Sequence, residues 1–211
     1  MRLRRWRDTV PWRSLRYCAL DFETTGLDVA TDAVLSFGAV PIDDGRPHLD
    51  ASCYRIADPG RPVPDEVVAI HGIRPADVAA APPLAAVVGE LSAAVTGRTL
   101  VVWTAWVEAA FLAKTLGGSA GRWRRTMIDV RNLVIRLDDE NGLISSPARD
   151  ASLMETAERM GVPAGVAHDA LADAFVTAQV FVVVATRLSV ARSLDAGALR
   201  RLGSAPPPAA R

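Results

Sequence analysis

Two acidic residues near the start of the chain, Asp21 and Glu23, stand two positions apart in an apolar segment typical of a β-strand. Successive side chains of a strand alternate between its faces, so both carboxylates point the same way while Phe22 points to the other side. Two carboxylates in one small volume repel each other unless a cation neutralises them, and acid oxygens favour Mg²⁺ or Mn²⁺. The pair therefore predicts a divalent metal site, although the solvated face of an edge strand would show the same tripeptide.

The residues that follow this pair supply groups suited to a phosphate backbone. Thr24 and Thr25 add hydroxyls, and Gly26, which precedes Leu27, lets a substrate backbone approach the strand end closely. We therefore expect these four residues to bind substrate.

A histidine and an aspartate far downstream, His168 and Asp173, complete the set of reactive groups. On one continuous helix a five-residue offset would put their side chains about 140° apart, so we place His168 in the loop before the helix and Asp173 in its first turns. Asp173 can then bind the metal, and His168 can take a proton near neutral pH. Asp169 leaves alternatives open, because it can face the same way as Asp173 or cap the helix, with His168 merely packed or exposed.

Residues 21–27 resemble the first motif of the DEDD exonuclease family, and residues 166–174 resemble the histidine form of its last motif. The resemblance runs from Tyr17 to about Leu188. It implies a ribonuclease H-like fold, four acids that hold two divalent metal ions, and 3′–5′ hydrolysis of single-stranded nucleic acid, DNA favoured, to nucleoside 5′-monophosphates. It also implies that His71 and Ile73 line the substrate terminus. Because the family includes the proofreading subunit of the bacterial replicative polymerase, a DNA polymerase subunit is a partner to expect; the oligomeric state is left open.

The second motif of this family is altered in the chain. Relatives carry a His-Asn pair, then an aspartate four residues after the Asn, then a Phe-Leu pair; here Phe111 sets the register and places Glu108 at the aspartate's position. The resemblance thus implies Glu108 as a metal ligand, direct or through water, and Phe111 as a substrate contact. Trp103 and Thr104 replace the His-Asn pair. Two interpretations of the tryptophans stay open: Trp103 or Trp106 stacks on a base of the substrate, or both pack in the core.

The altered motif leaves two alternatives to DNA hydrolysis open. One is a catalytically weakened exonuclease fold that serves as a nucleic-acid or polymerase-binding module. The other is an RNA 3′-trimming exonuclease, because motifs that recognise phosphates and a strand end do not reveal how the 2′-hydroxyl is treated.

The pattern of apolar residues predicts an α/β fold with a five-stranded mixed sheet flanked by helices. Short turns join the first three strands, so these are antiparallel, and the later strands are parallel. A Ser-x-x-Glu capping box at Ser152 opens one helix, and the acidic run that begins at Asp138 reads as a solvated loop. The expected strands are 17–23, 33–42, 51–56 and 99–103, with mixed signals in 126–137; the expected helices are 84–95, 107–116, 153–160 and 170–188, and 58–83 is irregular.

Composition and charge limit the organisation and the partners. The 211 residues, half of them apolar, suit one domain at 17–190, preceded by a basic extension at 1–16 and followed by a C-terminal segment at 191–211 with a disordered Pro/Ala tail. Residues 1–16 carry six arginines against one aspartate, so the neutral chain leaves a net charge of −5 on the rest. A body without a basic stripe suits an enzyme that holds only a strand end. The basic, tryptophan-containing start either contacts nucleic acid or packs on the sheet as an amphipathic lead-in.

The two cysteines, Cys18 and Cys53, are far apart in the sequence. Neither has a second cysteine or a histidine nearby at the spacing of a zinc site. The longest apolar run, near 176–184, is interrupted by polar residues, which excludes a membrane span. We therefore expect a cytoplasmic protein without membrane contact.

Overall fold

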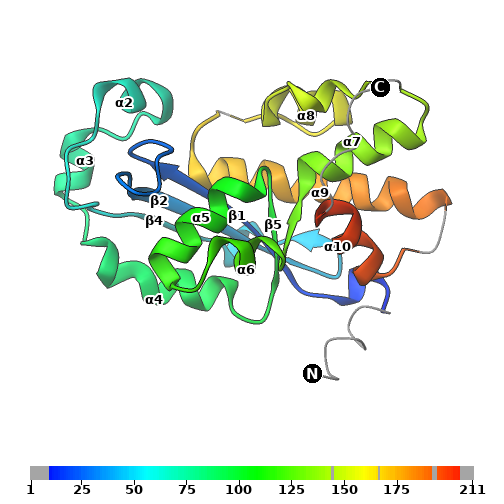
Figure 1. The fold of residues 1–211 in the computed structure, drawn as a ribbon, viewed down its shortest axis with the longest axis horizontal. Helices are drawn as coiled ribbons and strands as arrows, with labels where there is room; N and C mark the ends of the chain where they lie inside the picture. The colour runs from blue at the N-terminus through cyan, green and yellow to red at the C-terminus, as the bar shows by residue number, and fades with distance from the viewer. Residues whose placement is uncertain (1–9, 144, 166, 192–193, 205–211) are drawn as a thin grey trace.

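The computed structural model describes residues 10–143, 145–165, 167–191 and 194–204 (Figure 1). Its strands form one mixed sheet in which β1 pairs with β2 antiparallel and with β5 parallel. The α/β class and the change from antiparallel to parallel strands are confirmed, and the two-residue β3 is one strand more than expected. The strands are β1 Tyr17–Thr24, β2 Val34–Asp43, β3 Arg46–Pro47, β4 Cys53–Ile56, β5 Thr99–Val102 and β6 Met127–Asp129.

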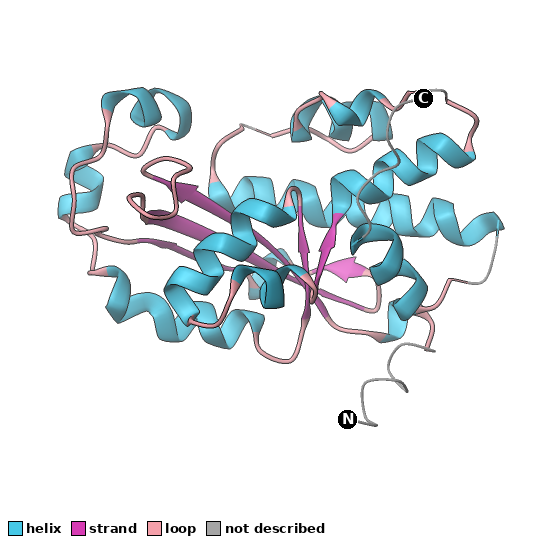
Figure 2. Cartoon of the chain, in the orientation of Figure 1, coloured by secondary structure: helices cyan, strands magenta, loops and turns pink. Residues whose placement is uncertain are grey.

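Helices cover both faces of this sheet (Figure 2). One face packs against α9, with α7 and α8 beside it, and the other packs against α4 and α5. The helices are α2 Asp65–His71, α3 Pro75–Ala79, α4 Leu84–Val95, α5 Ala105–Leu116, α6 Ala120–Arg124, α7 Val130–Glu140, α8 Leu153–Met160, α9 Ala170–Ala191 and α10 Ala196–Ser204.

The alternation along β1 decides where its acids point. Tyr17 and Ala19 belong to the core under α9, whereas Leu20 and Phe22 belong to the core under α4 and α5. Asp21 and Glu23 continue the first series, so they face α9. The predicted shared face of the two carboxylates thus becomes the face on which the downstream helix lies.

Helix α9 reaches the sheet because β2 carries Gly38 at the contact. A Cβ atom on Gly38 would lie 2.1 Å from the carbonyl oxygen of Ala170, the first residue of α9. The segment Ala170–Val190 is long and apolar enough to cross a membrane by length and composition alone, but 56% of that window is buried inside the protein. Its apolar side chains form the centre of the larger core.

Within the described residues, the second half of β1 has no strand paired to it on the side of β5. β1 pairs with β5 only through Tyr17 to Ala19, whereas its pairing with β2 continues to Thr24. The chain leaves β5 at Val102 and enters α5 at Ala105. The start of α5 is therefore close to the unpaired edge of β1, where Asp21 and Glu23 lie.

Three expectations for the middle of the chain were wrong or incomplete. The segment expected to be irregular contains α2 and α3, because prolines at Pro64 and Pro75 occupy helix starts, where a missing N–H costs nothing. The mixed segment 126–137 is a short strand followed at once by a helix. The acidic run ends α7 rather than forming a solvated loop, and Asp138 is buried in an ion pair with Arg159 at 2.8 Å.

Residues on both sides of the expected domain limits join the main core. Trp12 is 3% exposed, stacks edge-on against Phe181 and donates from Nε1 to Ser189 Oγ at 3.0 Å. Leu194 and Leu199 enter the same core from the C-terminal segment. Within residues 10–16, Trp12 therefore packs into the core against α9, while the arginines before residue 10 and the Pro/Ala tail lie outside the described residues.

Candidate active site

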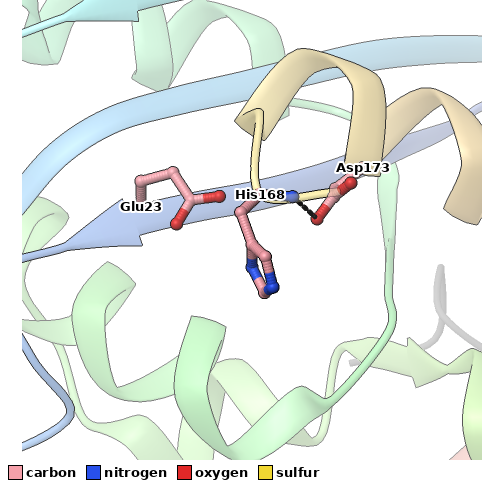
Figure 3. Close-up of side chains that lie close together, drawn as sticks. All are labelled: Glu23, His168 and Asp173. Atoms are coloured by element: carbon pink, nitrogen blue, oxygen red, sulfur yellow. Dashed lines mark hydrogen bonds between the residues drawn. The ribbon is translucent and has the colours of Figure 1, made fainter. Parts of the chain in front are cut away.

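Three of the expected side chains converge from distant parts of the chain (Figure 3). One potential ligand atom from each of Glu23, His168 and Asp173 lies within 4.8 Å of the other two. Glu23 comes from the end of β1, Asp173 from the first turn of α9, and His168 from the loop before that helix. The expected placement of His168 in a loop and Asp173 in a helix is confirmed.

Local hydrogen bonds fix this corner. His168 has a left-handed backbone, with φ of 64°, and its N–H donates to Asp173 Oδ2 at 3.1 Å. A histidine at positive φ is uncommon and marks a constrained position. Asp169 Oδ1 accepts the N–H of Ala172 at 2.8 Å, so Asp169 caps α9 and Asp173 lies in the cluster. The structure thus assigns different positions to the two aspartates that spacing alone left open.

Asp21 and Glu108 complete an acidic group around this cluster. Desolvation raises the pKa of Asp21 well above its usual value, and the charges of Glu108, Glu23 and Asp173 raise it further. Asp21 is therefore influenced by the charges of the other three acids expected at the metal site. Glu108 arrives on α5 beside the unpaired edge of β1 and is 5% exposed.

The carboxyls of this group hold their protons unusually tightly when no cation is bound. Burial raises the pKa of Glu23 to about 8, with Asp173 and Asp169 adding repulsion. Burial likewise raises the pKa of Glu108 to about 8, with a contribution from the charge of Asp129. Burial also raises the pKa of Asp173, against the opposing hydrogen bond from His168. Each of these shifts reflects the cost of a negative charge that lacks a nearby positive partner.

Two oxygens of the acidic group fit a divalent cation. Glu108 Oε2 and Asp173 Oδ1 are buried, and neither has a hydrogen-bond partner among the described residues. Buried acceptors are nearly always satisfied, so unpartnered ones need an explanation. Carboxylate oxygens are the ligands that Mg²⁺ and Mn²⁺ prefer, so a bound divalent cation is one partner that each of these atoms could take.

The turn after β1 uses its hydroxyls internally. Thr24 Oγ1 donates to the carbonyl of Gly26 at 2.6 Å, and Thr25 Oγ1 donates to Asp32 Oδ1 at 2.9 Å. A Cβ on Gly26 would lie 2.4 Å from the Asp32 carboxylate, so the turn needs glycine there. Both hydroxyls thus stabilise the turn in the absence of substrate, and the expected contacts of Thr24 and Thr25 with a phosphate backbone stay a prediction. Leu27, by contrast, is 61% exposed.

His71 and Ile73 lie where α2 ends. The N–H of Ile73 donates to His71 Nδ1 at 3.0 Å, which assigns the proton of a neutral imidazole to Nε2. That Nε2 is buried and has no partner among the described residues. Burial and then the charge of His168 lower the pKa of His71, so the two histidines are electrostatic neighbours. Ile73 is 7% exposed and packs in a small core with Leu35.

The aromatic residues of the second motif divide between core and surface. Trp103 is buried with the Arg131 guanidinium 5.2 Å from its ring centroid, whereas Trp106 is 51% exposed. Phe111 is 1% exposed in the core under α5, so its expected contact with substrate is wrong. In this position Phe111 packs α5 against the sheet.

Asp129, which was not expected at the site, ends β6 close enough to Glu108 to raise its pKa. Its side chain caps α7 by accepting the N–H of Asn132 at 3.0 Å. The available signal was an aspartate, a preferred N-cap residue, just before an apolar segment, but the mixed strand and helix character of that segment obscured it.

Known proteins resemble this chain in sequence and in fold. The family model described as Exonuclease matches residues 18–181. A DNA polymerase III subunit epsilon-like protein of Rhodobacter capsulatus is 29% identical over 174 residues, which are 81% of this chain and 24% of that protein. The chain spans about a quarter or less of the length of the curated relatives it matches.

Solved structures share the architecture. The nuclease domain of 3′hExo, a DEDDh family member bound to rAMP, has a TM-score of 0.64 at 17% identity, over 89% of this chain and 96% of that chain. E. coli exonuclease I in complex with a dA16 oligonucleotide has a TM-score of 0.68 at 18% identity, over 82% of this chain and 41% of that chain. The expected ribonuclease H-like fold is thereby confirmed.

Proposed function

The chain belongs to the DEDD exonuclease family, and we propose that it is a metal-dependent 3′–5′ exonuclease that removes nucleoside 5′-monophosphates from single-stranded nucleic acid, with DNA favoured. One observation carries the proposal: Glu23, His168 and Asp173 converge within 4.8 Å on an acidic group that also holds Asp21 and Glu108. A histidine among mutually repelling buried carboxylates suits proton transfer beside bound cations.

The residues divide the work of hydrolysis. Asp21, Glu23, Glu108 and Asp173 would hold two divalent ions, Mg²⁺ or Mn²⁺, which align the scissile phosphate and offset its negative charge. His168 is exposed beside the acidic group, so that water can approach its imidazole. It is therefore the residue that takes a proton from the attacking water. The water oxygen forms the new bond to phosphorus as the bond between phosphorus and the 3′-oxygen breaks. The released 3′-oxygen becomes a hydroxyl by taking up a proton. The released product is a nucleoside 5′-monophosphate.

Leu27 and His71 are the residues proposed to contact the strand end. Leu27 offers an exposed apolar side chain that can pack on the terminal base, and His71 offers a buried N–H that has no partner within the described part of the chain. Such a donor suits an oxygen of the terminal nucleotide, since leaving it unbonded costs free energy. A DNA polymerase subunit is the proposed partner, on the basis of the name of the Rhodobacter relative.

Polarity and metal dependence are tested together with single strands labelled at one end. In Mg²⁺ or Mn²⁺, a 5′-labelled strand should shorten stepwise, and a 3′-labelled strand should release its label as a mononucleotide at once. Release of a mononucleotide from the 5′ label first would refute the polarity. No shortening of DNA or RNA with either ion would refute the enzyme.

His168→Ala tests the proposed base. It should slow cleavage by about 10²–10⁴-fold, the usual contribution of a general base, while Mn²⁺ affinity stays close to that of the parent. Cleavage by the variant at the parent's rate would remove His168 from the reaction. A rate that falls only because Mn²⁺ no longer binds would make it a ligand instead.

A binding module remains the second candidate, and the observation that favours it is Glu108 in place of the family's aspartate. The longer side chain is buried, and its pKa near 8 opposes ionisation at neutral pH. A silent parent with an active Glu108→Asp variant would support the binding module. An active parent that loses activity on Glu108→Ala would support the enzyme. Comparing matched DNA and RNA strands decides between the DNA exonuclease and the RNA-trimming alternative.

A further inference from the structure

The start of α5 lacks the usual local cap. Thr104 occupies the N-cap position, but its side chain accepts no hydrogen bond from the helix. The first N–H of the helix, from Ala105, instead donates to Asp129 Oδ2 at 2.9 Å. The acceptor thus comes from 24 residues downstream, at the end of the neighbouring strand β6.

The same carboxylate also caps the helix that it precedes. Asp129 Oδ1 accepts the N–H of Asn132 at 3.0 Å at the start of α7. Val102, the last residue of β5, is the register partner of Asp129, so the carboxylate lies beside the point where the chain leaves the sheet for α5. One side chain therefore fixes the starts of two helices relative to the sheet, with one oxygen for each.

Glu108 depends on this arrangement for its position. It lies three residues after Ala105, and both side chains belong to the buried side of α5. Residues three apart on a helix share a face, so a shift of the helix start moves the Glu108 carboxylate with it. Because glutamate is one methylene longer than the aspartate of relatives, its oxygens reach the acidic group only from a suitably placed backbone.

We propose that Asp129 is a positioning residue for the metal site, which acts by anchoring the start of α5 and hence the carboxylate of Glu108. This inference rests on the proposed function, since it assigns Glu108 a cation to hold. Capping of α7 alone would not require the contact with Ala105, which links Asp129 to the helix that carries Glu108.

Asp129→Asn tests it with little change in shape. An amide has one acceptor oxygen, and its NH₂ group would face a backbone N–H, so at least one of the two contacts is lost. We expect the dissociation constant for Mn²⁺, titrated calorimetrically without nucleic acid, to rise about tenfold, as for other residues that orient a metal ligand. The kcat should fall by a similar factor, with little change in the KM for a single strand.

Asp195→Asn is the matched control, because Asp195 caps α10 through the N–H of Ala198 at 2.6 Å and touches no part of α5 in the described hydrogen bonds. It should lower the melting temperature without changing Mn²⁺ affinity. If Asp129→Asn behaves like this control, Asp129 is only a helix cap and the proposal is overturned.

A second variant separates action through Glu108 from direct metal binding. In a Glu108→Gln background, Asp129→Asn should cause little further loss of Mn²⁺ affinity, because its effect passes through the missing carboxylate. A full tenfold loss in that background would overturn the proposal. A parent that cleaves and binds Mn²⁺ leaves the proposed function standing in either case, whereas a parent that binds no Mn²⁺ overturns both.

Discussion

Replacing Glu108 by glutamine should change how the stability of the metal-free protein depends on pH. The pKa of the buried carboxyl is about 8, against an ordinary value of 4.5, so the folded state binds this proton more tightly than the unfolded state. The free energy of unfolding must then fall as the pH rises from 4.5 to 8, and the loss is complete above the folded pKa. Glu108→Gln removes one of the groups that titrate in this range and should make that part of the profile shallower, while Glu23, whose pKa is also about 8, still contributes to the slope.

The magnitude follows from the shift. One pKa unit corresponds to about 1.4 kcal/mol, so Glu108 costs the parent about 3 kcal/mol between pH 5.5 and pH 7.5. At roughly 2–4 °C per kcal/mol for a chain of this size, the melting temperature of the parent should fall by about 6–12 °C more than that of the variant. At 5% exposure, Glu108 has little solvent to screen it.

Thermal unfolding in EDTA between pH 5.5 and pH 7.5 measures the effect. Mn²⁺ should restore the stability of the parent at the higher pH, because ionised carboxylates bind the cation and binding stabilises the folded state. Glu155→Gln is the matched control, since hydrogen bonds from Ser152 lower the pKa of Glu155; that carboxyl is ionised throughout this pH range, and its removal should leave the slope unchanged. A Glu108→Gln profile as steep as the parent's would show that this carboxyl is not held among the other acids, and would refute the arrangement of the site.

Three further substitutions test how the fold supports the site. Gly38→Ala would place a Cβ 2.1 Å from the Ala170 carbonyl oxygen, so α9 must move; we expect a loss of about 1–3 kcal/mol in unfolding free energy and weaker Mn²⁺ binding. Lys114→Ala removes an ammonium that donates to two carbonyls of the loop after β1, at 2.9 and 2.5 Å, and should raise KM with a stability change within about 0.5 kcal/mol. Arg159→Ala leaves the buried carboxylate of Asp138 without its cation and should cost about 3–5 kcal/mol in urea unfolding, with unchanged cleavage by the folded protein.

Controls separate these effects from general damage. Gly89→Ala lies within α4, where an added Cβ meets nothing within 4 Å, and should stabilise by roughly 0.5–1 kcal/mol. Normal Mn²⁺ affinity in Gly38→Ala would contradict the close approach of α9. An unchanged KM in Lys114→Ala would show that the loop needs no anchor. Loss of cleavage by folded Arg159→Ala would mean that the ion pair between Arg159 and Asp138 influences the active site.

Local patterns predicted much of the fold because each depends on residues close together in the chain. The helix expected at 84–95 has those bounds, and the capping box at Ser152 opens α8 as expected. Local patterns failed where short elements follow one another directly: β6 has three residues and passes into α7 without a turn, so periodicities of two and 3.6 overlap. Asp138 was misread because its partner, Arg159, lies on another helix.

By itself, the sequence determined that Asp21 and Glu23 share one face of β1, and that His168 precedes the last long helix. Both follow from the fixed periods of strand and helix. Tertiary structure alone decided that Asp173 rather than Asp169 joins the cluster, that Phe111 is buried, and that Asp129 holds the start of α5. Spacing determines which way a side chain leaves its own element, but not which element packs opposite. In this protein β1 extends beyond its pairing with β5, which leaves an edge where α5 begins. Gly38 of β2 allows α9 to pack closely on the other face of the sheet.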